Sequence, residues 1–262
     1  MRVTILGCGT SGGVPRIGDD WGICDPNEPK NRRRRCSILL QDGASAVLVD
    51  TSPDLRQQLL DARIDRLDAV LWTHAHADQV HGIDDLRTIA IRSRKAVECY
   101  AAPDTVADLK RRFNYCFEQA PGSIYPAILK MHALNTHPMA GRFHLGQIPV
   151  QPFEQNHGDV VSLGFRFGPI GYSNDVVELS DQAFDALAGV EVWIVDAMRR
   201  IPHPTHAHLE RTLSWIARLK PRRAVLTNMH TDMDYQTLRR ELPEGVEPGF
   251  DGMTINSESA PG

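Results

Sequence analysis

Short apolar runs alternate along the chain with amphipathic stretches and clusters of turn residues. Apolar runs bounded by turn residues are typical of buried strands, whereas apolar residues at helical spacing predict helices. The pattern predicts strands at 3–6, 36–40, 46–50, 67–72, 96–100, 148–153, 162–167, 169–172, 190–195 and 224–227. It predicts helices at 53–62, 83–91, 105–116, 182–188 and 209–219, and an irregular insertion over 114–142. Alternation of this kind indicates an α/β protein.

A glycine-rich turn, GCGTSGGVP, follows the first predicted strand. Glycine lets the backbone approach a ligand closely, so this turn is either a phosphate contact or a plain tight turn. The polar stretch 16–35 is predicted to be a long loop, and it ends in the arginine run 32–35. Such a run is usually a solvated face, and the alternative is that one arginine meets a substrate phosphate.

Length, charge and cysteine content narrow the class of protein. A chain of 262 residues can form one large α/β domain or two small ones. Its formal net charge of -4 gives no overall field that would gather nucleic acid. The N-terminal residues lack the pattern of a signal peptide, and no apolar run approaches a membrane helix in length, so we predict a cytoplasmic protein with no membrane partner. Five irregularly spaced cysteines predict free thiols.

The stretch THAHADQVHG directly follows the predicted buried strand 67–72. His74 and His76 are two residues apart, so an extended backbone directs both imidazoles to the same side. Asp78 follows at the same spacing. Imidazoles together with a carboxylate suit Zn²⁺, Mn²⁺ or Fe²⁺. The pattern therefore predicts a metal site at the end of this strand.

Other strand ends supply further ligands. His157 follows the strand at 148–153, Asp175 follows the strand at 169–172, and His230 follows the strand at 224–227. Sites in α/β proteins often lie at such strand ends. An ordered series of histidines and aspartates at these places predicts that they complete the metal site.

These stretches, with GTSGGVP near the start and GFDGM near the end, resemble the metallo-β-lactamase-fold hydrolases. The resemblance spans almost the whole chain and implies one domain over 1–262, an αββα four-layer sandwich with a dinuclear metal site at one edge. Within that family the chain most resembles the phosphodiesterase branch, which contains the PhnP-like proteins and tRNase Z.

The resemblance also implies a ligand set. His74, His76 and His157 would hold the first metal ion, and Asp175 would bridge to a second ion held by Asp78, Gln79 and His230. Position 79 is normally a histidine in this family. Gln79 could ligate through its amide oxygen and favour Mn²⁺, the second position could be empty, or His81 could replace it after a local shift. Gln79 could also only hydrogen bond to a water on the metal.

Further histidine and aspartate residues are expected to assist catalysis or to orient the metal ligands. In the phosphodiesterase branch a histidine just before a helix assists the phosphate or the leaving group, and the alignment of THAHL gives this role to His206, with His208 as the alternative. Asp78 and Asp175 would orient the metals and the attacking water. Asp50 and Asp196 would each accept the free N–H of a ligating histidine, and Asp196 could equally cap the loop after it.

We therefore predict a metal-dependent phosphoric diester hydrolase that uses two divalent ions, Zn²⁺ or Mn²⁺, on a small cyclic nucleotide or cyclic ribose phosphate. One alternative is a non-catalytic protein that binds metal and nucleotide phosphate and has a weakened second metal site. Another is a tRNase Z-like nuclease, but the chain has no long basic insertion for tRNA, and a nucleic-acid partner is not expected. Members of the branch often dimerise, so a homodimer is expected by resemblance.

Overall fold

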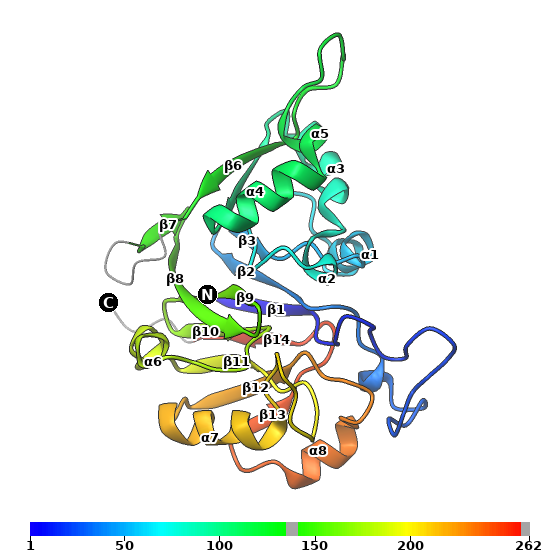
Figure 1. Ribbon diagram of the computed structural model, residues 1–262, viewed down its shortest axis with the longest axis vertical. Helices are drawn as coiled ribbons and strands as arrows, with labels where there is room; N and C mark the ends of the chain where they lie inside the picture. The colour runs from blue at the N-terminus through cyan, green and yellow to red at the C-terminus, as the bar shows by residue number, and fades with distance from the viewer. Residues whose placement is uncertain (135–140, 258–262) are drawn as a thin grey trace.

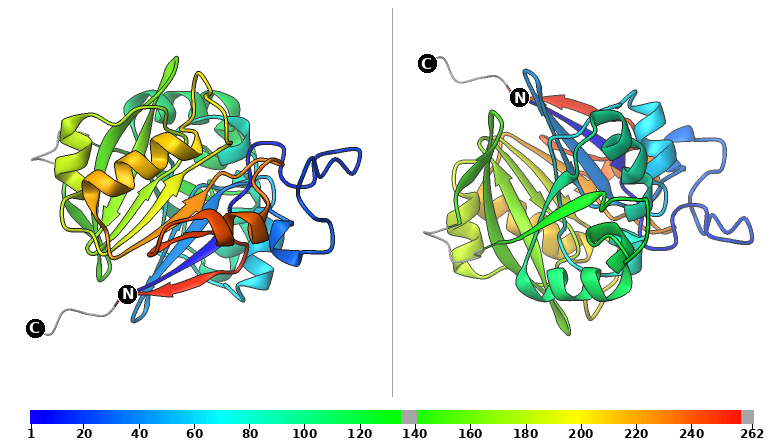
Figure 2. Two further views of the ribbon diagram at one scale, coloured as in Figure 1. Left: turned by 90° about the horizontal axis from the view of Figure 1, so that it is seen from below. Right: turned by 90° about the horizontal axis from the view of Figure 1, so that it is seen from above.

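The computed structural model describes residues 1–134 and 141–257. Its strands form two seven-stranded sheets. The sheets pack face to face, and helices cover the outer face of each (Figures 1 and 2). This arrangement is the four-layer αββα sandwich, so the fold class predicted from the sequence is confirmed.

The first sheet has the strand order β14-β1-β2-β3-β4-β5-β6. Its strands are β1 (Arg2–Gly7), β2 (Ser37–Asp42), β3 (Ser45–Val49), β4 (Ala69–Leu71), β5 (Val97–Ala101), β6 (Leu129–Ala133) and β14 (Thr254–Asn256). Strands β3 to β6 pair in parallel. Strands β3 and β4 are apolar along most of their length and fully buried, as expected for parallel strands covered on both faces.

The second sheet has the order β13-β12-β11-β10-β9-β8-β7. Its strands are β7 (Phe143–Leu145), β8 (Ile148–His157), β9 (Val160–Phe167), β10 (Ile170–Ser173), β11 (Val192–Asp196), β12 (Arg223–Thr227) and β13 (Val246–Pro248). Strands β10 to β13 pair in parallel, so their carboxyl ends lie at one edge of this sheet.

The helices are α1 (Leu55–Asp61), α2 (Ala77–Val80), α3 (Leu86–Ser93), α4 (Pro103–Arg112), α5 (Asn114–Phe117), α6 (Asp181–Leu187), α7 (Leu209–Leu219) and α8 (Tyr235–Glu241), with 3-10 turns at Pro29–Asn31 and Ile83–Asp85. Ser180 starts α6 by accepting a hydrogen bond from the backbone of Ala183. Among the described helices, none combines the length and the apolar character needed to cross a membrane.

Large apolar side chains fill the space between the sheets. Phe165, Phe167 and Tyr172 are fully buried there, whereas the equally buried Trp193 points to the outer face of the second sheet, toward α6. A second cluster, which includes Trp72, packs the outer face of the first sheet against α1, α3 and α4. All five cysteines are free and buried, which confirms the prediction of free thiols.

Most predicted strands and helices are present, with shifted ends. Strand β8 continues past residue 153 to His157 because it pairs with β9 as far as the His157 and Val160 pair. The irregular insertion predicted over 114–142 is wrong for its described part, which contains α5 and β6. Strands β7, β13 and β14 and helix α2 were not predicted, since each gives only three or four residues, too few for a recognisable period, and helix α8 was also missed.

Replacing Phe165 with alanine should lower the free energy of unfolding by about 3–5 kcal/mol, because the fully buried ring leaves a cavity between the two sheets. Equilibrium denaturation in guanidinium chloride measures this change. The matched control is Ile124→Ala, since Ile124 is 85% exposed, and its unfolding should change by about 0.5 kcal/mol or less. Equal effects of the two substitutions would contradict the placement of Phe165.

Candidate metal centre and active site

The candidate site lies where strand ends of the two sheets meet. Asp50 follows β3, Asp175 follows β10 and Asn228 follows β12. These three residues have φ angles of 63°, 52° and 60°. Left-handed backbone is uncommon outside glycine and gathers at functional sites, where it sets the direction of a side chain. The turns after these strands therefore aim polar side chains into the same region.

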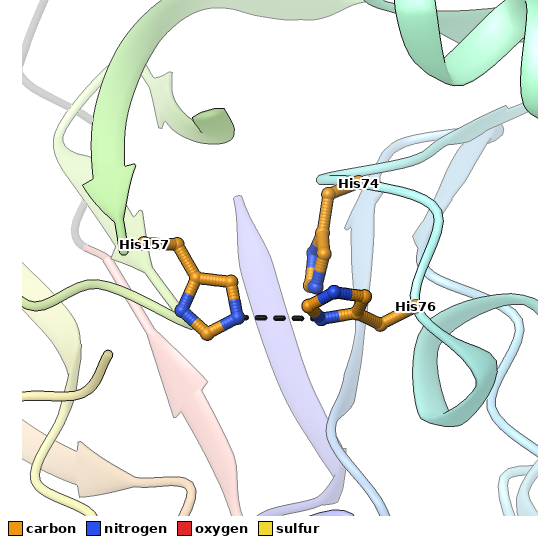
Figure 3. Close-up of side chains that lie close together, drawn as sticks. All are labelled: His74, His76 and His157. Atoms are coloured by element: carbon orange, nitrogen blue, oxygen red, sulfur yellow. Dashed lines mark hydrogen bonds between the residues drawn. The ribbon is translucent and has the colours of Figure 1, made fainter. Parts of the chain in front are cut away.

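Three imidazoles converge in this region (Figure 3). His74 and His76 come from the segment after β4, and His157 is the last residue of β8. Their ring centroids lie 4.4 to 5.2 Å apart, and His157 Nε2 is 3.3 Å from His76 Nδ1. Their ligand atoms all lie within 4.8 Å of one another, which is compatible with ligation of one ion.

The hydrogen bonds of these histidines leave nitrogens for a metal. His157 Nδ1 donates to the carbonyl oxygen of Thr205 at 2.7 Å, so its Nε2 keeps a lone pair. His74 Nε2 is buried and has no hydrogen-bond partner. A buried nitrogen normally has a partner, and a divalent ion would provide one. The three histidines therefore fit a first metal ion.

Burial keeps two of these imidazoles in the neutral form that binds metal. Burial, reinforced by the neighbouring His157, holds the pKa of His74 well below its ordinary value. Burial also lowers the pKa of His157 to about 4. No proton therefore competes with a metal at these two ligands near neutral pH.

Asp50 supports this histidine group through Thr73. The backbone N–H and the hydroxyl of Thr73 donate to the Asp50 carboxylate at 2.8 to 3.1 Å. The Thr73 hydroxyl oxygen lies 3.1 Å from His74 Nδ1. Asp50 was expected to accept the N–H of a ligating histidine directly, and the structure instead places Thr73 between the two groups.

Asp78 and Asp175 face each other across the amide of Gln79. Gln79 Nε2 donates to Asp78 Oδ2 at 3.0 Å and to Asp175 Oδ2 at 2.9 Å. Asn228 Nδ2 donates to the other oxygen of Asp175, Oδ1, at 3.1 Å. Burial raises the pKa of both carboxyl groups, and the shift is the larger at Asp175, which is the more deeply buried.

His206 is held by Asp196 beside the same group. His206 Nδ1 lies 3.0 Å from Asp196 Oδ2 and 3.5 Å from Asp175 Oδ1. Burial alone would lower the pKa of His206, but the Asp196 carboxylate outweighs burial and, with Asp175, raises this pKa to about 9. Asp196 thus contacts His206, the histidine expected to assist the leaving group, rather than one of the three histidines that fit a metal ion.

Three other histidines face elsewhere. His230 Nδ1 lies 3.2 Å from Asp232 Oδ1 and its Nε2 lies 3.3 Å from Arg16, so the structure does not bring His230 to Asp78 and Asp175. His81 is exposed and packs its ring edge to face with Phe113. His208 is the N-cap residue of α7 and is absent from the candidate ligand groups of the described residues.

The arginine run makes structural contacts. Arg33 is buried and donates to the carbonyl oxygen of Met233 at 2.6 Å. Arg34 pairs with Asp61 at 2.6 Å and Arg35 pairs with Asp54 at 3.0 Å. Arg32 lies over the ring of Trp21. The alternative that one of these arginines contacts a substrate phosphate gains no support from these contacts.

Asn228 and Thr73 are site residues that the sequence reasoning missed. Asn228 is the first residue after β12 in LTNMH, and Thr73 directly precedes His74. Histidine and aspartate are the usual metal ligands, so an asparagine and a threonine carry no such signal in the sequence. The position of Asn228 immediately after a buried strand was the available signal.

Two adjoining cavities open at this site. The smaller, of about 250 Å³, is lined by groups that include Ser11, His76, Asp78, His157, Asp175 and His206. The larger, of about 620 Å³, shares His76, Asp159 and Val160 with it and extends along Pro103, Asp104, Val161 and Leu163. A substrate could therefore place one end among the titratable groups and the other in the larger cavity.

Comparison with known proteins agrees with this architecture. The β-lactamase superfamily domain matches residues 45–229. The solved structure of a new diphosphatase from the PhnP family is 33% identical to this chain with a TM-score of 0.89, and the match covers 98% of both chains. Zn²⁺-bound PqqB from Methylobacterium extorquens is 19% identical with a TM-score of 0.73, covers 98% of this chain and 100% of its own, and shows a similar fold.

A curated relative is similar over one part of its own sequence. An octanoyltransferase from Porphyromonas gingivalis (strain ATCC BAA-308 / W83) is 32% identical over 256 residues, which is 97% of this chain and 51% of the relative. The chain thus spans about half the length of this relative.

In the metal-free protein the imidazole of His206 should titrate near pH 9, and Asp196→Asn should lower that pKa. Because the folded pKa lies above the ordinary value of 6.5, the proton stabilises the fold fully below pH 6.5, and this stabilisation is lost as pH rises through 9. Two-dimensional NMR of the histidine rings against pH measures the pKa of His206, and the His206→Gln variant identifies its signal. Asp181→Asn, at an exposed ion pair with Arg218, is the control. An unchanged His206 pKa in Asp196→Asn would contradict the assigned contact.

Proposed function

The chain belongs to the β-lactamase superfamily, in its PhnP-like branch, and from this premise we propose that it is a metal-dependent phosphodiesterase. The proposed substrate is a small cyclic nucleotide or cyclic ribose phosphate. The observation that carries the proposal is that a positively charged His206 and metal-binding histidines line one small cavity. Such a cavity suits the anionic phosphoryl group of a diester.

His74, His76 and His157 would hold the ion, with Asp175 beside them. A divalent ion, Zn²⁺ or Mn²⁺, would supply Lewis acidity that offsets phosphoryl charge and makes water more acidic. The carboxylates of Asp78 and Asp175 line the same cavity and would orient the attacking water.

His206 would act on the leaving group. Asp196 engages Nδ1, so Nε2 is the nitrogen available to a substrate oxygen. Because the pKa of His206 is raised to about 9, the ring carries its proton at neutral pH. That proton can be donated to the leaving oxygen as its bond to phosphorus breaks.

The larger cavity favours an organic group on the substrate. Val160, Val161 and Leu163 give it an apolar wall, and Asp104 and Asp159 add carboxylates that suit sugar hydroxyl groups. The Asp104 carboxylate, which lines only the larger cavity, would repel a second phosphate. A diphosphate is nevertheless a second candidate, because the solved structure that matches along 98% of both chains is described as a diphosphatase.

Other activities have less support. The octanoyltransferase is twice as long as this chain, so its name gives no reason to propose acyl transfer here. The alternative of a non-catalytic binding protein differs from a phosphodiesterase in one experimental outcome. Phosphate esters would protect such a protein against heat denaturation without being hydrolysed. The cytoplasmic location and the homodimer stay predictions.

Dialysis against a chelator should abolish hydrolysis of bis(p-nitrophenyl) phosphate, and added Zn²⁺ or Mn²⁺ should restore it, because the ligand histidines need an ion to act on phosphate. His74→Ala should not be restored at the same metal concentration. His144→Ala, on the exposed edge of β7, is the matched control and should behave like wild type. Absence of turnover in wild type with every metal would support the binder.

His206→Gln should lower kcat about 10²–10⁴-fold for 2′,3′-cyclic AMP, since the leaving alkoxide needs a proton. The loss should be smaller for bis(p-nitrophenyl) phosphate, whose leaving group is weakly basic. Steady-state kinetics on both substrates measures the difference. Equal losses would mean that His206 positions the phosphate and does not protonate the leaving group.

A further inference from the structure

The second metal position implied by the resemblance is occupied by side-chain amides. By that resemblance it should hold an ion between Asp78 and Asp175, with further ligands from position 79 and from His230. The structure places Gln79 and Asn228 there, while His230 contacts Arg16 and Asp232.

The carboxylates that would bind the ion already accept hydrogen bonds. Gln79 Nε2 lies 3.0 Å from Asp78 Oδ2 and 2.9 Å from Asp175 Oδ2. Asn174 Nδ2 donates to the same oxygen of Asp175 at 2.6 Å, and Asn228 Nδ2 donates to Oδ1 at 3.1 Å. Both oxygens of Asp175 are therefore paired with N–H donors.

These amides do not fit a cation. A second ion would need oxygen atoms directed at it, whereas the amide nitrogens of Gln79 and Asn228 are directed at the carboxylates. Turning the Gln79 amide over would place its nitrogen where Oε1 now lies, buried and without a hydrogen-bond partner. This rotation would also remove the hydrogen bonds that Gln79 donates to Asp78 and Asp175. The ion would gain only a neutral amide oxygen, which is a weaker ligand than imidazole.

We infer that the protein binds one divalent ion per chain, at His74, His76 and His157, and that the amides of Gln79 and Asn228 take the place of the second ion. The inference rests on the proposed function only for the first ion. Neutral N–H donors satisfy the carboxylates that a second cation would otherwise neutralise. The chain thus keeps the shape of a two-ion site while binding one.

The inference identifies the two substitutions that should create a second site. Histidine at both positions 79 and 228 would replace two N–H donors with two imidazole nitrogens facing Asp78 and Asp175. Asn228 has a φ of 60°, and histidine, like asparagine and aspartate, is one of the residues that tolerate this backbone. The double variant Gln79→His/Asn228→His is therefore compatible with the fold.

The test counts ions. Wild type, Gln79→His, Asn228→His and the double variant are stripped with a chelator, equilibrated with excess Zn²⁺ or Mn²⁺ and freed of unbound metal. Elemental analysis and titration calorimetry then give the number of ions per chain. We expect one ion in wild type and two in the double variant, with His230→Ala, the matched control, also binding one.

Each outcome decides a separate point. Two ions in wild type would overturn the inference, and so would a single ion in a folded double variant. If the double variant does not fold, as shown by its circular dichroism, the wild-type count still decides: one ion supports the inference and two ions overturn it. No ion in wild type would contradict the first site, and with it the proposed function, while one ion without turnover would leave the inference standing and overturn the phosphodiesterase.

Discussion

The buried carboxylate of Asp175 is the constraint around which the site is organised. It follows β10 in a left-handed turn and is 2% exposed, so water cannot solvate its charge. A buried charge is costly unless it is paired and hydrogen bonded. Partners from three other segments meet this need: Gln79 after β4 and Asn228 after β12 donate hydrogen bonds, and His206 before α7 lies within ion-pair distance. These contacts link the two sheets at the edge where substrate would bind.

The same burial separates the histidines into two kinds. His74 and His157 lie among other imidazoles, and their pKa values fall because burial opposes a positive charge. His206 is partly buried, but it faces Asp196 and Asp175, and these carboxylates raise its pKa to about 9. Residues of one type thus take on different chemistry, metal binding or proton donation, according to which charges lie beside them.

Buried strands and the His-x-His spacing leave clear patterns, and these predicted an α/β protein with a metal site after the strand 67–72. The four-layer sandwich and the grouping of His157 with His74 and His76 were implied by the family resemblance. The ligand set implied by the resemblance placed His230 at the second metal ion, whereas the structure places Asn228, two residues earlier, against Asp175. The alternation of side chains that holds within β12 ends at Thr227, and the left-handed turn at Asn228 redirects the chain toward Arg16. Side-chain direction beyond a strand end depends on that turn, which residue spacing does not reveal.

The charge of the site bears on the choice between the two candidate substrates. With one ion, the positive charge facing the small cavity comes from that ion and from His206, and the amides of Gln79 and Asn228 add none. A phosphodiester carries a single negative charge, whereas a diphosphate carries more and gains more from a second cation. Asp104 in the adjoining cavity would further oppose a second phosphate, because Arg112, a cation in that lining, already pairs with Asp108. The replacement of the second ion by amides and the acidic wall therefore both favour a singly charged diester with an organic leaving group.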